Sequence, residues 1–413
     1  MSTYDARLKR MTDAAALSEP DRVPISPVLQ CYPVFHAGYS MKDVLYDFDK
    51  GAESFKKFAR EYEPDAMFGQ AYINIGAGPL FELMRPKTLV WAGAPGATIS
   101  DDSIHQFIEF PVLLEEDMPY FSRDYSGWLV GKGFPAVSGL LEPMQGLGLS
   151  RMGPMMDISM LAAAFSTPGM RETIETLWKI ADMKQDLNAK SAKLDDELEE
   201  AGFPVLHKGM AMVPFDNYSD FYRGTIDTMM DLYENPDVIT DFCKVQLEYV
   251  FDMIRAQGQF LKGKWVFMAL HKGMDTFLSD EHYRKLYWSD LQRIIEEIIN
   301  QGMTPYIYTE GKYDSRLDCL KEVTKGKVVY HFEQCDMVRA KKVLGDVACI
   351  SGGFPVYLLD YGTKQQVIDE CKRLIDGCAA GGGYIFETGH GFDHSKPENV
   401  EAMFETVKTY GKR

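Results

Sequence analysis

The feature that most constrains the fold is the regular alternation of short apolar runs with longer helical segments from residue 203 onward. The runs are rich in Val, Ile, Phe and Tyr and have the length of buried strands. Strands are predicted at residues 203–209, 264–273, 303–311, 327–336, 346–353 and 383–391. Helices are predicted between them, most clearly at residues 221–260, 279–300 and 363–379. Because a strand, a helix and a second strand form a right-handed crossover, this half of the chain predicts a parallel α/β sheet.

Two further strands are predicted in the N-terminal part, at residues 22–31 and 64–72, with a helix between them that Ser40 caps. Eight strand–helix units close into a (β/α)8 TIM barrel, which we predict as one domain over residues 1–413. The barrel carries an N-terminal extension and a β-hairpin excursion, within an inserted segment at about 85–160. A doubly wound open sheet is the alternative, but no Gly-x-Gly-x-x-Gly motif follows the first strand to support dinucleotide binding.

The net charge limits the possible partners, and the cysteine content indicates the redox state of the thiols. The net charge of −17 argues against a nucleic acid or an anionic membrane as partner, since both require a basic face. The chain has no apolar run long enough to span a membrane and no apolar secretory region at its start, so a cytoplasmic protein is expected. Seven dispersed cysteines without a Cys-x-x-Cys pair indicate reduced thiols, most of them in the core.

Histidine and glutamate residues gather at or near the predicted strand ends. The carboxyl ends of barrel strands meet at one mouth, so these side chains are expected to face one another. They are His207, His271, Glu310, His331, Glu333, Glu387 and His390. Neutral imidazole and carboxylate suit zinc, and the same groups serve as general acids and bases. Both a zinc site and metal-free catalysis therefore remain open at this point.

Several motifs give the chain a resemblance to a known superfamily. Residues 278–288 are similar to a helix start of the uroporphyrinogen decarboxylase superfamily, and residues 336–346 resemble the helix before its seventh strand. Gly389-His-Gly391 followed by Pro-Glu-Asn-Val at residues 397–400 resembles its C-terminal motif. Within this superfamily the chain looks like the methyltransferases that work with corrinoid proteins. Residues 22–40 lack the arginine-rich motif of the true decarboxylases.

The resemblance implies a metal and a reaction. Thiol-methylating members bind zinc through His-x-Cys on the fifth strand and a Cys on the eighth, where this chain has Tyr308, Glu310 and His390. Aromatic O-demethylase members have a Glu and a His separated by 20 residues, and 20 residues lie between Glu310 and His331. A further upstream Glu of that pattern would fall at Ile295. The resemblance and the clustering at strand ends thus indicate zinc bound by Glu310, His331 and His390. Among the clustered residues, Glu310, His271 and Glu333 are the candidate catalytic residues.

The implied reaction removes the methyl group of an aromatic methyl ether and passes it to Co(I) of a corrinoid on a separate protein. Aromatic and histidine residues are candidates for binding this small substrate: Tyr32, Phe35, His36, Tyr72 and His207, with Tyr39 and Trp128 as further members of an aromatic pocket. A thiol or amine methyl donor, or a metal-free decarboxylase or lyase, is the alternative. The sequence leaves open whether the protein is a monomer or a homodimer.

Overall fold

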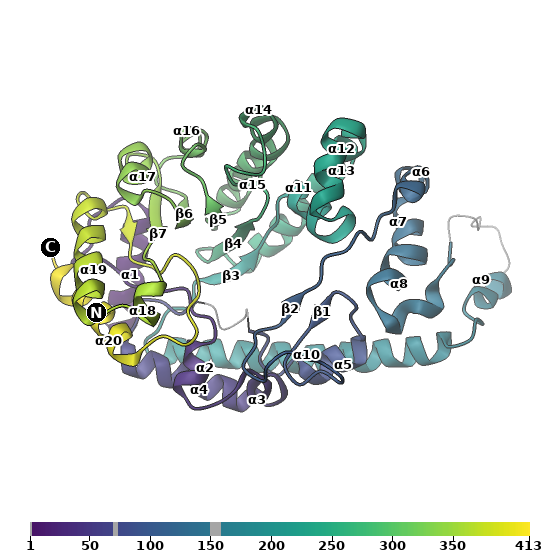
Figure 1. Ribbon diagram of the computed structural model, residues 1–413, viewed down its shortest axis with the longest axis horizontal. Coiled ribbons are helices and arrows are strands. Elements are labelled where there is room, and N and C mark those ends of the chain that lie inside the picture. The colour runs from purple at the N-terminus through teal and green to yellow at the C-terminus, as the bar shows by residue number, and fades with distance from the viewer. Residues whose placement is uncertain (1, 69–72, 149–157) are drawn as a thin grey trace.

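Six parallel strands form the main sheet, in the order in which they occur along the chain (Figure 1). The computed structural model describes residues 2–68, 73–148 and 158–413. The strands are β3 (His207–Met210), β4 (Trp265–Leu270), β5 (Thr304–Lys312), β6 (Val329–Gln334), β7 (Cys349–Gly352) and β8 (Tyr384–Ile385). Each is hydrogen-bonded to the next, as the alternation of strands and helices predicts.

The two predicted N-terminal strands close the sheet, although they form single bridges rather than continuous ladders. The parallel bridges are Ile25–Phe386, Leu29–Phe392 and Met67–Val205. Between the two segments, the Asp65 N–H donates to the carbonyl of Ile25 at 2.8 Å. Pro24 and Pro27 lack an N–H, which interrupts the ladder in the first segment. The contacts nevertheless run from β8 through both segments to β3, so the (β/α)8 barrel is confirmed in place of the open sheet.

The strand side chains alternate between two apolar regions. In β4, Trp265 and Phe267 belong to a cluster inside the barrel, whereas Val266 and Met268 pack in the cluster between the strands and the outer helices. Helix α1 (Thr3–Ala15) is the N-terminal extension, and its Met11 lies in the interior cluster. Both faces of the strands are therefore buried, which explains their continuous apolar sequence.

Helices surround the strands, and some predicted helices are divided. The larger ones are α4 (Phe48–Tyr62), α10 (Met170–Glu200), α12 (Thr225–Glu234), α13 (Pro236–Gly258), α15 (Ser289–Asn300), α17 (Met337–Leu344), α19 (Lys364–Cys378) and α20 (Pro397–Tyr410). Asp47 ends α3 (Met41–Tyr46) and caps α4, and Pro236 begins α13 where one continuous helix was predicted. Ser40 and Ser279 cap their helices as expected.

Short helices complete the framework. They are α2 (Tyr32–His36), α11 (Pro214–Asn217), the π-helical η5 (Tyr218–Arg223), α14 (Asp280–His282), the π-helical η6 (Tyr283–Trp288), α16 (Leu317–Leu320) and α18 (Tyr357–Asp360). In the described part of the chain, no helix combines the length and the apolar character that a membrane crossing requires. All seven cysteines are free thiols.

The helical part of the inserted segment lies at the opposite end of the molecule from α19 and α20, whereas its two strands lie nearer the middle (Figure 1). Its β1 (Leu89–Val90) and β2 (Gln106–Phe107) pair antiparallel, which confirms the predicted hairpin. Helix α5 (Gly78–Met84) precedes the segment, and the remaining elements described in it are short helices: η1 (Glu115–Asp117), α6 (Met118–Arg123), α7 (Tyr125–Trp128), η2 (Leu129–Gly133), α8 (Phe134–Val137), η3 (Gly139–Met144) and α9 (Ile158–Ala164). Frequent Gly and Pro residues here prevent longer elements.

Candidate active site

Three predicted catalytic residues lie at the mouth formed by β4, β5 and β6. His271 follows the last residue of β4, while Glu310 and Glu333 lie near the ends of β5 and β6. The His271 Nε2 atom is 3.7 Å from Glu310 Oε1. These three positions confirm that polar groups at adjacent strand ends share one mouth, as the barrel predicts.

A β-bulge sets the position of Glu310. The pairing of β5 with β6 changes register between Thr309 and Lys312, so that two residues, Glu310 and Gly311, lie opposite the single residue Glu333. Gly311 has φ of +75°, and a Cβ atom at this position would lie 3.1 Å from the sulfur of Met274. Its N–H donates to Glu333 Oε2 at 2.6 Å. Glu333 therefore holds the bulge that directs Glu310, and only glycine suits this turn.

Asp216 anchors the chain where it leaves β4. Its buried carboxylate accepts the N–H groups of His271 at 3.0 Å and Lys272 at 2.9 Å, and the hydroxyl of Tyr287 at 2.6 Å. Burial raises the pKa of Asp216 to about 6, although the charge of His271 and the hydrogen bond from Tyr287 oppose this rise. Asp216 thus holds the backbone of the two residues that follow β4.

Asp220 then orients the side chains of the same two residues. It forms an ion pair with His271 Nδ1, and its other oxygen lies 3.1 Å from Lys272 Nζ. Burial alone lowers the pKa of His271, but the hydrogen bond with Asp220 and the charges of Glu310 and Asp216 raise it to about 9. At neutral pH His271 is therefore an imidazolium whose Nε2 faces Glu310.

Glu310 links this imidazolium to solvent, since 43% of its side chain is exposed. Burial of the carboxyl group raises its pKa, the charge of His271 opposes the rise, and Glu333 adds to it. A proton held on His271 can be delivered to a ligand and replaced through Glu310. The arrangement is suited to general acid catalysis.

Asp216 and Asp220 were missed by reasoning from the sequence. They lie in α11 and η5, directly after β3, in the run Pro-Phe-Asp-Asn-Tyr-Ser-Asp at residues 214–220. Two carboxylates four residues apart on a helix share one face, which was the available signal. The π-helical turn at η5 gave no signal in the sequence, although such turns are frequent at functional sites.

The predicted zinc ligands do not fit a metal centre in this arrangement. Among the described residues, no group of three His, Cys, Asp or Glu side chains is placed to hold a metal ion. His331 lies within β6 rather than at its end; its Nδ1 is 2.8 Å from Glu387 Oε2, and its Nε2 is 2.9 Å from the carbonyl of Gly389. His390 is exposed in the loop after β8. The zinc site remains a prediction from the resemblance, and no chemical step is assigned to zinc.

His331 instead belongs to a buried network inside the barrel. Its partner Glu387 also accepts the Tyr306 hydroxyl at 2.7 Å, and Tyr308 stacks on the His331 ring at 4.4 Å. His331 and Glu387 are both fully buried. This fully buried hydrogen-bonded pair and its additional contacts tie β5, β6 and β8 together.

His207 is the first residue of β3, so its predicted position at the carboxyl end of that strand is wrong. Its ring stacks on Phe68 at 3.9 Å and packs against Trp265 and Tyr306. Burial and the nearby charge of His331 lower its pKa to about 3, so the ring is neutral. Neither ring nitrogen has a hydrogen-bond partner among the described residues. The surrounding aromatic rings give His207 a packing role in the barrel interior.

The predicted N-terminal substrate residues are occupied with packing. Tyr32 is buried, with its hydroxyl 2.8 Å from that of Tyr62. Phe35 stacks on His394 with ring centres 4.2 Å apart, and His36 pairs with Glu61. These contacts join α2 to α4 and to the loop after β8. Tyr72 lies outside the described residues.

Comparison with known proteins identifies the family. The sequence profile for uroporphyrinogen decarboxylase (URO-D) matches residues 168–410, more than half of the chain. The chain belongs to the uroporphyrinogen decarboxylase family. The matched part contains β3 to β8 and every residue of the His271 site. The superfamily inferred from the motifs at residues 278–288, 336–346 and 389–400 is thereby confirmed.

Individual similar proteins show how much of the chain this relationship covers. The uroporphyrinogen decarboxylase of Azoarcus sp. is 24% identical over 200 residues, which cover 47% of this chain and 53% of that protein. The enzyme of Neisseria meningitidis serogroup C is 28% identical over 187 residues, covering 44% and 51%. The chain thus spans about half the length of the curated relatives it matches. A solved methyltransferase from Methanosarcina mazei shares the fold, with a TM-score of 0.60 at 13% identity over 98% of each chain.

Proposed function

We propose that this chain is a methyltransferase that takes the methyl group from an aromatic methyl ether. The methyl acceptor is Co(I) of a corrinoid carried by a separate protein, whose electron pair forms the new bond to carbon. The superfamily resemblance suggests this reaction class, and a protein named methyltransferase shares the fold along its whole length. The observation that carries the proposal is the placement of His271 at the barrel mouth, where its Nδ1 pairs with Asp220 and its Nε2 faces Glu310.

His271 provides what an ether oxygen requires as it leaves. When the methyl–oxygen bond breaks, the electron pair stays on oxygen and generates a phenoxide, a poor leaving group unless its charge is neutralised. A proton from His271 Nε2 converts this oxygen to the phenol, and Glu310 restores the proton from solvent. Lys272, 3.1 Å from Asp220, adds positive charge beside the site.

The alternative is a decarboxylase or lyase that uses the same acid–base pair, in keeping with the names of the family relatives. The charge of the mouth favours the ether over a substrate with several carboxylates. Asp216, Asp220, Glu310 and Glu333 contribute four acidic groups against the cations His271 and Lys272. In the described part of the chain, the ion pairs of Asp220 and Glu310 are formed with these two cations. An incoming carboxylate therefore meets net negative charge, whereas a neutral ether does not.

Product formation from 2-methoxyphenol with Co(I) cobalamin as acceptor tests the proposal. Chromatography of the demethylated phenol and loss of the Co(I) absorbance measure the transfer. His271→Gln is expected to lower kcat by about 10²- to 10⁴-fold, because general acid catalysis contributes a rate factor of this size. Activity should fall as the pH rises through about 9, where His271 loses its proton.

His282→Gln is the matched control, because the ring of His282 contacts Tyr233 and no residue of the site. Equal activity of His271→Gln and wild type would refute the role of the imidazolium. Transfer from a methyl thiol or methylamine alone would show that the donor class is wrong. Release of carbon dioxide from a porphyrinogen without any Co(I) acceptor would establish the alternative.

A further inference from the structure

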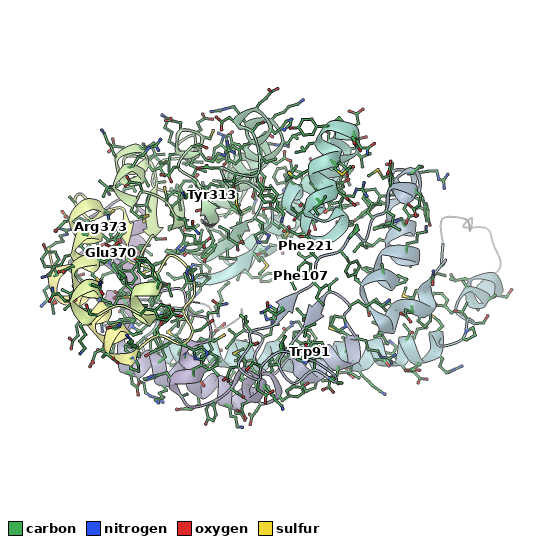
Figure 2. All side chains as sticks on the ribbon, viewed as in Figure 1. Trp91, Phe107, Phe221, Tyr313, Glu370 and Arg373 are labelled. Atoms are coloured by element: carbon green, nitrogen blue, oxygen red, sulfur yellow. The ribbon has the colours of Figure 1, made fainter. Side chains whose placement is uncertain are left out.

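An apolar cavity lies between the inserted segment and the helix that carries Asp220. Its volume is about 260 Å³, and six aromatic side chains line it: Phe107, Phe110, Trp128, Phe134, Phe221 and Tyr222. We call this space the aromatic cavity. Apart from Thr88, its lining comes from three parts of the chain, residues 107–112, 128–137 and 217–222. Figure 2 shows Phe107 and Phe221 close together between the strands and the inserted segment, with ring centres 6.0 Å apart.

The rim of the aromatic cavity leaves large apolar rings exposed. Phe107 is 48% exposed, Phe221 45% and Phe134 38%. Single exposed aromatic residues are common, but three that line one concave space form a binding surface, since contact with water is unfavourable for each ring. An apolar ligand would remove this surface from water.

The aromatic cavity reaches the residue that pairs with the proposed acid. Asp220 is one of its lining residues and also pairs with His271. A ring held in the cavity therefore lies next to the residue that orients the imidazolium. The N-terminal aromatic residues have no such relation, because Tyr32 and Phe35 pack between α2, α4 and the loop after β8.

One polar group in the cavity wall has no partner. Trp128 is fully buried, and its indole N–H makes no hydrogen bond with any described residue. An unpaired buried donor is unfavourable, so native proteins rarely retain one without a reason. Trp128 is also one of the residues that line the cavity.

We propose that the aromatic cavity binds the ring of a small neutral aromatic substrate, with Trp128 donating its N–H to an oxygen substituent of that ring. The reaction of the bound substrate rests on the proposed function, whereas the binding site is inferred from the structure alone. Size supports it: a cavity of about 150 Å³ holds benzene, so 260 Å³ admits one ring with a few small substituents. A macrocycle of four pyrrole rings is too large.

Binding of 2-methoxyphenol and toluene to the isolated chain tests the inference without any turnover. Dissociation constants are measured by ligand-observed NMR. Trp128→Phe removes the donor and keeps an aromatic ring, so binding of 2-methoxyphenol should weaken about three- to tenfold, the value of one hydrogen bond. Binding of toluene should change less than about twofold, because toluene has no acceptor.

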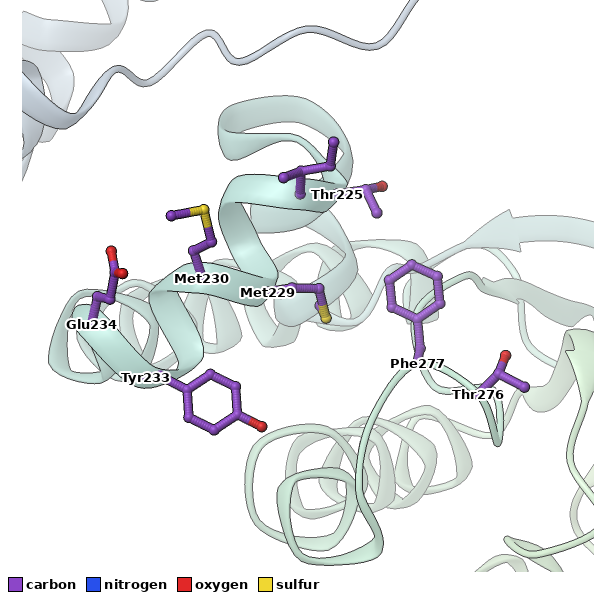
Figure 3. A pocket seen from close by; sticks show the side chains of 8 residues that line it. Thr225, Met229, Met230, Tyr233, Glu234, Thr276 and Phe277 are labelled. Atoms are coloured by element: carbon purple, nitrogen blue, oxygen red, sulfur yellow. The ribbon is translucent and has the colours of Figure 1, made fainter.

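Phe221→Ala is the second variant. Phe221 lies half-exposed at the rim, so its replacement should have little effect on folding. It should weaken both probes about threefold or more, by loss of an aromatic contact. The matched control is Met230→Ala in a second apolar hollow on α12, lined by Met229, Met230, Tyr233 and Phe277 (Figure 3). Met230 is 49% exposed, and its removal should leave both constants unchanged.

The possible outcomes distinguish the aromatic cavity as a binding site from the proposed methyl transfer. Absence of binding in the wild type, or equal binding by Phe221→Ala and Met230→Ala, would overturn the aromatic cavity as the substrate site and leave it as a surface for a protein segment. Binding with the expected pattern but no transfer to Co(I) would refute the proposed function and keep the cavity as an aromatic-ligand site. Transfer whose KM is unaffected by Phe221→Ala would refute the cavity alone.

Discussion

The pKa of His271 is the property on which the proposed chemistry depends, and Asp220→Asn tests its origin. The asparagine keeps the size of the side chain and a hydrogen-bond acceptor but removes the charge that pairs with His271 Nδ1. Loss of an opposite charge in direct contact is expected to lower the pKa of the ring by about 1 to 3 units from its value near 9. Burial, which lowers the pKa, is then opposed only by Glu310 and Asp216.

The same change predicts a stability effect with a definite sign. A pKa of about 9 in place of 6.5 corresponds to at most about 3 kcal/mol in favour of the folded, protonated state. Solvent reduces this figure, because 28% of the His271 side chain is exposed. A raised histidine pKa contributes stability that is complete below pH 6.5 and is lost as the pH rises through about 9. Asp220→Asn should therefore destabilise the protein more at about pH 6 than at about pH 10.

Two measurements check this prediction. NMR titration of the imidazole rings gives the pKa directly, with the His271 signal assigned by its loss in His271→Gln. Urea unfolding at both pH values gives the free energy of unfolding of wild type and variant. Asp252→Asn is the charge-matched control, because Asp252 is 73% exposed and lies on α13 away from the mouth. Titration of His271 near 6.5 in the wild type, or an unchanged pKa in Asp220→Asn, would refute the reasoning.

Two further predictions concern the residues implied as zinc ligands. His331→Leu leaves the buried carboxyl group of Glu387 without its imidazole partner and should lower the free energy of unfolding by about 3–5 kcal/mol. Tyr306→Phe removes one hydrogen bond to the same carboxyl group and should lower it by about 1–3 kcal/mol. Losses below about 1 kcal/mol for both, measured in urea, would contradict a structural pair. Elemental analysis tests the zinc site that the resemblance implies, and a metal content that is unchanged in Glu310→Ala and His390→Ala would exclude that site. About one zinc per wild-type chain that is lost in both variants would instead support the three-residue site.

The sequence by itself determined the barrel and part of its mouth. Apolar runs at regular intervals specify strands buried on both faces, and such strands close only with helices around them. Because barrel strands point the same way, residues that follow or end them must meet, and His271, Glu310 and Glu333 do so. The hairpin also followed from local signals, since its turns and alternating residues are contiguous in the chain.

Only the tertiary structure decided which polar residues reach the mouth and which are used for packing. His207 and His331 have the same local signal as His271, but their positions along β3 and β6 place them inside the barrel, where aromatic rings and Glu387 surround them. Asp220 contacts a residue 51 positions later, and the aromatic cavity joins segments about 100 residues apart. Local periodicity specifies the face on which a side chain lies, whereas such distant contacts depend on how whole elements pack.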